Sequence, residues 1–141
     1  MTRMLQAEAM RFLADGTRTG KLATASATGA PHVAPIWFVV DGDHLVFTTG
    51  IGTVKGRNLR ENPRAALSVD LSEFPYDFVV VRGKVAVAER APDLLRWAVR
   101  IAERYVPPGR AQGYGERNAV PEELLCRLHI ERIVGEKDIA L

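Results

Sequence analysis

The stretch KLATASATGAPHVAPIWFVVDGDHLVFTT, residues 21–49, decides the fold class of this chain. It contains three runs, KLATASA, HVAPIWFVV and HLVFTT, that alternate or are dense in β-branched and aromatic residues, and the turns TGAP and DGD separate them. Turns this short join antiparallel strands, because parallel strands need a crossover of a dozen residues or more. Residues 21–49 are therefore predicted to form a three-stranded antiparallel meander.

The rest of the chain adds three predicted strands, which are RAALSVD (64–70), FVVVRGKVAVAE (78–89) and CRLHIERIVGEKD (126–138). Gly83 is expected to mark a bulge or bend in the second of them. Six strands that run mostly as hairpins, with appended helices, predict a mainly β fold. We expect an antiparallel barrel with closed edges, in one domain that spans residues 1–141.

Apolar residues at helical spacing predict a helix around residues 5–13 and another over DLLRWAVRIAERY (93–105). The segment 106–120 is rich in glycine and proline and is interpreted as a loop, a candidate mobile flap that shapes substrate choice. The segment PEELL (121–125) is predicted to be a helical turn before the last strand.

Composition limits the possible classes of function. Of the 141 residues, 47% are hydrophobic and 26% are charged, and the net charge of +2 is too small to indicate bulk nucleic-acid binding. The single cysteine excludes an internal disulfide. No stretch has the apolar length of a signal-peptide core or a membrane span. We expect a cytoplasmic protein that acts on a small molecule, with neither nucleic acid nor membrane as a partner.

The stretch TTGIGTVKGRNLRENPRAALSV, residues 48–69, gathers the cations Lys55, Arg57, Arg60 and Arg64 within ten positions. One interpretation is a solvated helix face that Glu61 partly neutralises. The other is an anion site, because three local features point to the same place. These features are the hydroxyls of Thr48 and Thr49 at a strand end, the glycines 50, 52 and 56 that let the backbone approach a ligand, and Thr53 as the N-cap of a short helix. Hydroxyls, N–H groups and cations at a helix start match a phosphate best.

The glycines of this stretch do not form a nucleotide-binding fingerprint. Lys55 stands where the G-x-G-x-x-G spacing needs its third glycine, and Arg57 stands where a P-loop needs serine or threonine. Hairpins precede the segment, whereas both motifs occur in parallel βαβ units. A Rossmann or P-loop fold is therefore excluded.

The remaining reactive side chains indicate no metal site and no nucleophile. His32, His44 and His129 are far apart in the sequence, without metal-ligand spacing. Cys126 is expected to be buried and inert. Tyr76 is the candidate proton donor, because the loop SEFPYDF is expected beside the anion site, although solvent could supply the proton instead.

The motifs G-K-L-A-T…G-x-P-H-V-x-P-I-W (residues 20–37) and T-x-K-x-R-N-L-x-x-N-P-R (residues 53–64) carry a resemblance. Together with the closing HIERIVGEKD, they make residues 5–138 similar to the pyridoxamine-phosphate-oxidase-like split barrels. More narrowly, the chain resembles their actinobacterial branch of flavin/deazaflavin-dependent oxidoreductases, which use coenzyme F-420. The resemblance implies a homodimer of six-stranded split β-barrels with cofactor sites at the interface.

The resemblance also implies which residues bind the cofactor. Lys55 and Arg57 match the phosphate-binding pair, with Asn58 next to them and Thr48 and Thr49 supplying hydroxyls. The strand whose backbone runs along the ring system is matched by Ala34, Pro35, Ile36 and Trp37. Arg60, or Arg64, could meet the longer anionic tail of F-420.

The expected function is that of an F-420H2-dependent reductase, which passes hydride to a small conjugated or heteroaromatic substrate that enters near the 72–77 loop. An FMN-dependent oxidase or reductase is the alternative, because FMN shares the ring-ribityl-phosphate layout. A non-catalytic carrier of F-420, flavin or haem is the alternative from another class. Oxidation of pyridoxamine phosphate is not expected, since IERIVGEKDIAL offers no counterpart for the basic residues that this substrate needs.

Overall fold

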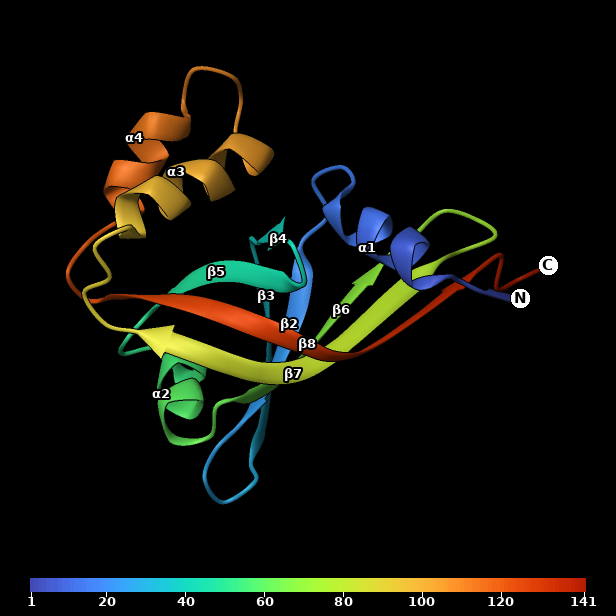
Figure 1. Ribbon diagram of the computed structural model, residues 1–141, viewed down its shortest axis with the longest axis horizontal. Helices are drawn as coiled ribbons and strands as arrows, with labels where there is room; N and C mark the ends of the chain where they lie inside the picture. The colour runs from blue at the N-terminus through green and yellow to red at the C-terminus, as the bar shows by residue number, and fades with distance from the viewer.

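Eight strands form one antiparallel sheet, accompanied by four helices, in the computed structural model, which describes residues 1–141 (Figure 1). In chain order the elements are β1 (Thr2–Arg3), α1 (Gln6–Ala14), β2 (Gly20–Ala25), β3 (Pro31–Ile36), β4 (Val39–Asp41), β5 (His44–Gly50), α2 (Val54–Glu61), β6 (Arg64–Asp70), β7 (Phe78–Ala88), α3 (Leu94–Tyr105), α4 (Ala111–Asn118) and β8 (Glu123–Lys137). None of the helices is long and apolar enough to cross a membrane.

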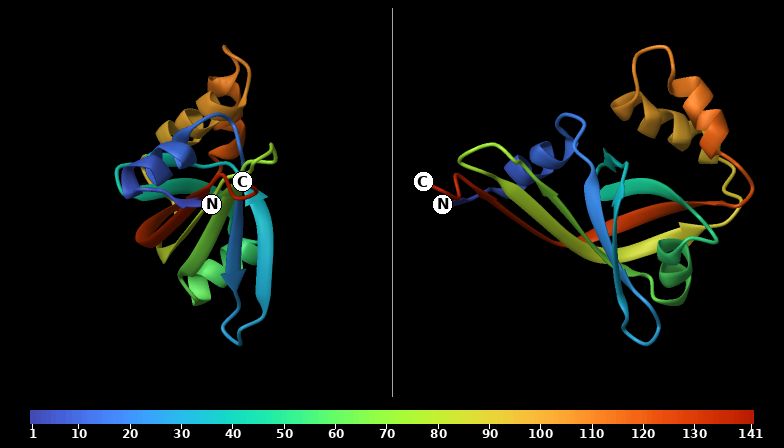
Figure 2. Two further views of the ribbon diagram at one scale, coloured as in Figure 1. Left: turned by 90° about the vertical axis from the view of Figure 1, so that its right-hand side faces the viewer. Right: turned by 180° about the vertical axis from the view of Figure 1, so that it is seen from behind.

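The sheet is a barrel that remains open along one line. Its strand order is β3-β2-β6-β7-β8-β5-β4, and β1 pairs with the far end of β8. The two edge strands, β3 and β4, follow each other directly in the chain, so the chain passes from one edge of the curled sheet to the other (Figure 2). The predicted antiparallel split barrel is thus confirmed, but the expectation of closed edges is wrong, because β3 and β4 do not pair with each other.

The predicted strand over residues 32–40 is broken in two at Trp37 and Phe38. Phe38 does not hydrogen-bond to a neighbouring strand, because α3 supplies its partners. Its N–H donates to the Tyr105 hydroxyl at 3.3 Å, and its carbonyl accepts from the Arg104 guanidinium at 2.8 Å. Side chains of a distant helix therefore satisfy the backbone where the sheet splits. This break and the two-residue β1 raise the strand count from the predicted six to eight.

Two local predictions near the C-terminus are wrong. The segment 106–120 is not an irregular loop, because α4 occupies residues 111–118 and packs on α3, where a side chain on Gly115 would collide with Val99. The segment PEELL is not a helical turn either, since β8 begins at Glu123, which pairs with Gly50 of β5. In both places tertiary packing, of α4 on α3 and of β8 on β5, outweighs local propensity.

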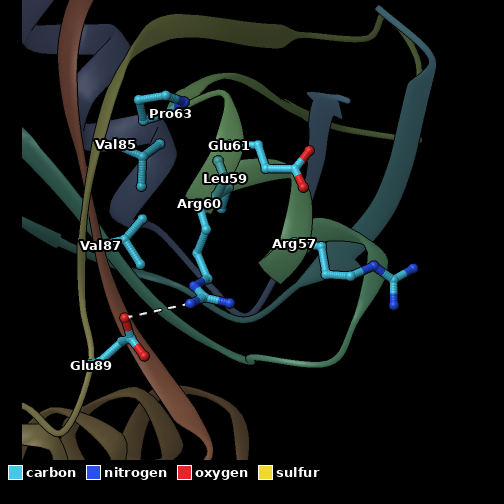
Figure 3. Close-up of a pocket in the computed structure, with 8 residues that line it drawn as sticks. All are labelled: Arg57, Leu59, Arg60, Glu61, Pro63, Val85, Val87 and Glu89. Carbon is cyan, nitrogen blue, oxygen red and sulfur yellow. Dashed lines mark ion pairs between the residues drawn. The ribbon is translucent and has the colours of Figure 1, made fainter. Parts of the chain in front are cut away.

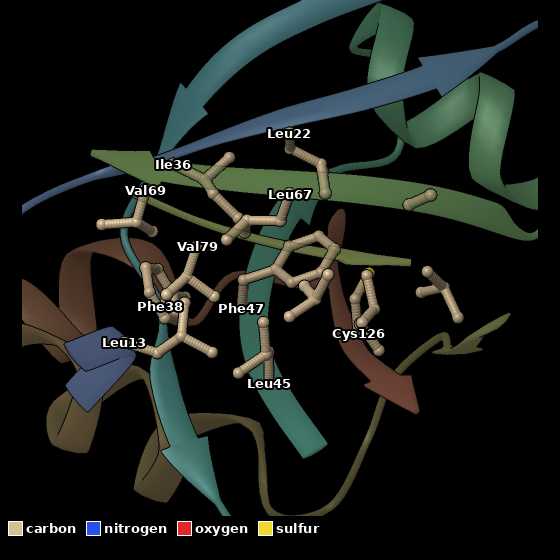
Figure 4. Close-up of a cluster of buried hydrophobic side chains, with 14 of the residues drawn as sticks. Leu13, Leu22, Ile36, Phe38, Leu45, Phe47, Leu67, Val69, Val79 and Cys126 are labelled. Atoms are coloured by element: carbon tan, nitrogen blue, oxygen red, sulfur yellow. The ribbon is translucent and has the colours of Figure 1, made fainter. Parts of the chain in front are cut away.

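The barrel interior holds the main hydrophobic core, to which α1 contributes from one end (Figure 4). Leu13 of α1 and Phe38, Phe47 and Leu67 of the sheet region are fully buried there, as is Cys126. A second cluster lies under α3 and includes Trp97 and Ile101. Gly83 marks a register shift between β7 and β8, which confirms the predicted bulge. The helices α1 and α3–α4 thus cover different ends of the barrel (Figure 1).

Candidate functional site

The turn from β5 into α2 has the geometry that the sequence predicted. Thr53 is the N-cap: its hydroxyl accepts from the Gly56 N–H at 3.0 Å and donates to the Gly50 carbonyl at 2.8 Å. Because that single proton is used, the Thr49 hydroxyl is the donor in its 3.0 Å contact with the Thr53 hydroxyl. A side chain on Gly56 would collide with the Gly50 carbonyl, so only glycine fits this turn.

A pocket of about 220 Å³ lies beside this turn. It brings together five residues predicted from the sequence, which are Pro35, Ile36, Trp37, Thr48 and Lys55. Its other walls come from α3, α4 and the start of β8, through Ala98, Ile101, Asn118 and Glu123. The end of β3 and the start of α2 therefore face the same pocket. The other walls come from α3, α4 and β8, which follow much later in the chain.

Trp37 forms a fixed aromatic wall of this pocket. Its ring stacks on the ring of Tyr105, with centroids 5.1 Å apart and planes 6° from parallel. A second aromatic ring, that of Tyr114 on α4, lies 6.4 Å from it and is tilted by 48°. Trp37 is half-buried and lines the pocket, so it combines a packing role with a face toward the pocket.

Lys55 is the cation of the pocket, and it is left without a carboxylate partner. None of the ion pairs in the structure involves it. By contrast, Arg60 pairs with Glu89 at 3.7 Å and Arg64 with Glu131 at 3.1 Å. The solvated-face interpretation therefore describes Arg60 and Arg64, whereas Lys55 faces the pocket.

Glu123 is a pocket residue that the sequence analysis missed. Burial raises the pKa of its carboxyl above the ordinary value, while the Thr48 hydroxyl and the Lys55 ammonium act in the opposite direction. Glu123 is not identified as a site residue from the sequence, because PEELL is interpreted there as a helical turn. Only the pairing of β8 with β5 brings Glu123 next to Gly50, and no local sequence signal announces this pairing.

Arg57 and Arg60 do not line the pocket that contains Lys55. Both line a separate pocket of about 600 Å³ between α2 and the end of β7 (Figure 3). Arg57 points away from Arg60 there, and its guanidinium donates to the Gly52 carbonyl at 3.0 Å. Residues two apart on a helix do not face each other. The expected phosphate-binding pair of Lys55 and Arg57 is therefore divided between two pockets within one chain.

Three further predicted residues point elsewhere. Asn58 is only 7% exposed, and its amide donates to the Thr24 hydroxyl at 3.1 Å, so it ties α2 to β2. Thr49 is also buried and serves the N-cap. Ala34, on the edge strand β3, is half-buried outside the set of pocket-lining residues. Each helps to shape the site region without facing the pocket.

Tyr76 lies at the opposite end of β7 from α2. Its loop precedes Phe78, the first residue of β7, and the Tyr76 carbonyl accepts from the N–H of Ile139 near the C-terminus at 3.0 Å. Figure 1 shows this connection between β6 and β7 beside the two chain termini. The structure therefore does not bring Tyr76 to the pocket of the same chain.

The family model described as pyridoxamine 5'-phosphate oxidase matches residues 5–134 of the chain. The chain belongs to this family. No curated protein matches the sequence. The expected family is thus established from most of the length of the chain, and not from the basic stretch alone.

Several solved structures share the fold of this pyridoxamine 5'-phosphate oxidase family member. A conserved hypothetical protein from Mycobacterium tuberculosis has a TM-score of 0.81 at 24% identity, covering 98% of this chain and 89% of the other. A structure described as an F-420 reductase has a TM-score of 0.67 at 27% identity, covering 87% of this chain and 94% of the other. A FAD-binding protein from Mesorhizobium loti has a TM-score of 0.69 at 24% identity, covering 95% and 93%.

The histidines and the cysteine of this family member form no alternative centre. The rings of His44 and His129 lie 4.0 Å apart across β5 and β8, and His44 contacts Asp43 at 3.2 Å. No group of three or more His, Cys, Asp or Glu side chains in the structure is arranged to hold a metal ion. Cys126 is buried in the core, as predicted, and burial raises the pKa of its thiol to about 12, which favours the protonated form.

Proposed function

We propose that this protein is an F-420H2-dependent reductase of small conjugated or heteroaromatic substrates. The observation that carries the proposal is the pocket in which an aromatic wall, a hydroxyl and an unpaired cation meet, namely Trp37, Thr48 and Lys55. A ring system with a phosphate needs this combination of surfaces. The similarity to a structure described as an F-420 reductase, at 27% identity, favours the deazaflavin among ligands of this type.

The residues of the pocket fit the binding of such a group. Lys55 and Thr48 would hold the phosphate, because a free ammonium and a hydroxyl form charge-assisted and neutral hydrogen bonds to its oxygens. Trp37, with the backbone of residues 34–36, would orient the ring, since the stack on Tyr105 fixes the indole. When bound, the reduced deazaflavin supplies the hydride. The protein then needs to bind, orient and exclude water, and solvent can supply the proton.

FMN remains the second candidate cofactor, because the same ring, ribityl and phosphate groups would meet the same residues. The similarity to a FAD-binding protein from Mesorhizobium loti supports a flavin only at the level of the fold, at 24% identity. The two pairings that occupy Arg60 and Arg64 would have to open before either cation could meet the anionic tail of F-420. Arg60 as a cofactor contact therefore stays a prediction.

Parallel titrations of the purified apoprotein with F-420 and with FMN, followed by fluorescence, test the proposal. Tight F-420 binding and weak FMN binding are expected, followed by steady-state reduction of an enone acceptor with F-420H2. Tight binding of FMN without binding of F-420 would identify FMN, and not the deazaflavin, as the cofactor. Tight F-420 binding without turnover of any acceptor would indicate a carrier, and binding of neither cofactor would refute the proposal.

A homodimer with the cofactor sites at its interface is part of the same proposal. The edge strand β3 pairs only with β2, and its Val33 side chain is 65% exposed. An open strand edge with an exposed apolar side chain is a surface that proteins usually cover. Light scattering coupled to gel filtration should give twice the 15.5 kDa of one chain, and Val33→Lys should lower this mass. In such a dimer, Tyr76 of one copy could reach only the pocket of the other copy.

A further inference from the structure

Glu123 places a second charged group in the pocket, beside Thr48 and Lys55, the residues proposed to hold the cofactor phosphate. It is the first residue of β8 and pairs with Gly50, the last residue of β5. One oxygen of its carboxyl lies 3.7 Å from the position that a side-chain carbon on Gly50 would occupy. The carboxyl therefore lies over the turn that leads into α2, beside the residues that would hold an anion.

The surroundings of Glu123 contain one cation and no second carboxylate. Lys55 of α2 is the charged group that interacts electrostatically with Glu123. Cys126, on the same strand as Glu123, is the other titratable group that interacts with it. The remaining elements contribute only neutral side chains to the pocket, which are Thr48 of β5, Pro35, Ile36 and Trp37 at the sheet opening, Ala98 and Ile101 of α3, and Asn118 of α4.

Glu123 and Lys55 line the same pocket without forming an ion pair. A space thus separates the two charges, and a ligand group next to Lys55 also comes under the influence of Glu123. A phosphate attracted by Lys55 would be repelled by an ionised Glu123, since like charges about 4 Å apart interact by roughly 1 kcal/mol even in water and by more near a protein surface.

We propose that Glu123 is a specificity-determining residue that sets the charge of the ligand which the pocket accepts. In its ionised form it opposes a phosphate on Lys55, and in its protonated form it can donate a hydrogen bond to a phosphate oxygen. The identity of the phosphate-bearing ligand rests on the proposed function, whereas the effect of Glu123 on a phosphate does not.

Proton linkage predicts the direction in which the affinity for a phosphate changes with pH. Because burial already raises the pKa of Glu123, a bound phosphate would raise it further and binding would take up a proton. The affinity for a phosphate-bearing ligand should therefore fall as the pH rises through the titration of Glu123. The phosphate monoester of FMN itself gains charge with a second pKa of about 6, so the effect of Glu123 is obtained as the difference between wild type and a variant.

The variant is Glu123→Gln, which keeps the shape and removes the charge. Its matched control is Glu122→Gln, because Glu122 is the exposed neighbour that does not line the pocket. Dissociation constants for FMN and riboflavin, and for F-420 and its deazariboflavin core without phosphate, are measured by fluorescence between pH 5 and pH 8. Thermal denaturation of each variant confirms that it is folded.

At pH 8 Glu123→Gln should bind the phosphate-bearing ligands roughly fivefold more tightly than wild type, in line with a like-charge repulsion of about 1 kcal/mol. The gain should shrink toward pH 5, and the phosphate-free partners and the Glu122→Gln variant should show none. Equal or weaker binding by Glu123→Gln at pH 8, the same gain for riboflavin, or no binding of either phosphate-bearing ligand by Glu123→Gln would overturn the inference.

The two proposals fail in different ways. If phosphate-dependent tightening is observed but F-420H2 reduces no acceptor, the proposed reductase function is wrong and the role of Glu123 stands. If F-420 binds and supports turnover while Glu123→Gln changes neither affinity nor its pH dependence, the reductase function stands and the role of Glu123 is wrong.

Discussion

Trp37 and Tyr105 stack with ring centroids 5.1 Å apart and planes 6° from parallel, and this contact joins the sheet opening to α3. The Tyr105 hydroxyl lies 3.0 Å from the Arg18 carbonyl and 3.2 Å from the Phe38 carbonyl, and it accepts from the Phe38 N–H. Burial raises the pKa of Tyr105, so the hydroxyl stays protonated and available as a donor. The Tyr105 side chain thus hydrogen-bonds to the backbone of Phe38 at the strand break and also packs against Trp37, the aromatic wall of the pocket.

Replacing Tyr105 by phenylalanine should destabilise the protein while keeping the stack on Trp37. The ring remains, but the buried backbone groups of Phe38 lose a partner, which should cost about 1–3 kcal/mol. Urea denaturation measures this free energy of unfolding. Tyr114→Phe is the control, because the Tyr114 ring also lies near Trp37 while no hydrogen bond of its hydroxyl is found. An equal loss in both variants would contradict the assigned role of Tyr105.

Lys55 and Arg57 should differ in their importance for cofactor binding, although the sequence motif treats them as a pair. Lys55→Met should weaken binding by about 1.5–3 kcal/mol, because it removes a charge-assisted hydrogen bond from the pocket. Arg57→Met should have a smaller effect, since its guanidinium faces another pocket and a backbone carbonyl. Fluorescence titration of F-420 or FMN measures both constants. Equal losses would show that both cations reach the phosphate, for instance across a dimer interface.

Asn58 should contribute to stability and not to ligand contacts. Asn58→Ala removes the amide that satisfies the buried Thr24 hydroxyl, and a buried unsatisfied group costs about 1–3 kcal/mol. A double-mutant cycle with Thr24→Val isolates the interaction, because the two residues are in direct contact. We expect a coupling energy near that of one buried hydrogen bond, about 1 kcal/mol. Additive effects would show that Asn58 acts through other partners.

Gly56 should not tolerate alanine, whereas Gly52 in the same turn should. A side-chain carbon at Gly56 would meet the Gly50 carbonyl and the Thr53 hydroxyl, while the same carbon at Gly52 would find open space. Gly56→Ala should therefore cost about 1–3 kcal/mol through forced backbone shifts. Gly52→Ala should stay close to wild type. Denaturation of both variants tests whether the close approach of α2 to β5 is as tight as the structure indicates.

The burial of Glu123 predicts a pH dependence of stability in the apoprotein. Its pKa is raised above the ordinary value of 4.5, so the folded state binds this proton more tightly than the unfolded chain does. The carboxyl has no effect on stability where both states are protonated, below about pH 4, and it destabilises the fold as the pH rises through its raised pKa. Glu123→Gln should therefore be more stable than wild type at pH 8.

The same comparison at pH 4 provides the control for this prediction. There the stability of Glu123→Gln and wild type should converge, because both side chains are neutral. Urea denaturation at the two pH values gives the difference. A variant that is less stable than wild type at pH 8 would show that the ionised carboxylate is held favourably by Thr48 and Lys55, against the dominance of burial.

The sequence carried much of the fold because the relevant signals are local. The short turns TGAP and DGD required hairpins, and β2, β3 and β5 formed where they were predicted. Thr53 was recognisable as an N-cap from its own segment, and Gly83 as a bulge. The sequence failed where tertiary contacts override the local signal, at the break after Ile36, at α4 and at the start of β8. A strand is interrupted at Phe38 only because Arg104 and Tyr105 replace its ladder partners.

For the candidate site, the local sequence identified the groups that are present: a basic, glycine-rich turn after a strand, with Lys55 and the threonine hydroxyls at its start. Which of these groups line one pocket depends on the folded arrangement of the chain. This arrangement set Lys55 and Trp37 in one pocket, turned Arg57 and Asn58 away, and added Glu123 from β8. The physical reason is that side-chain type is a local property, whereas direction depends on helix phase and strand register. A pairing such as Gly50 with Glu123 exists only after the sheet has formed.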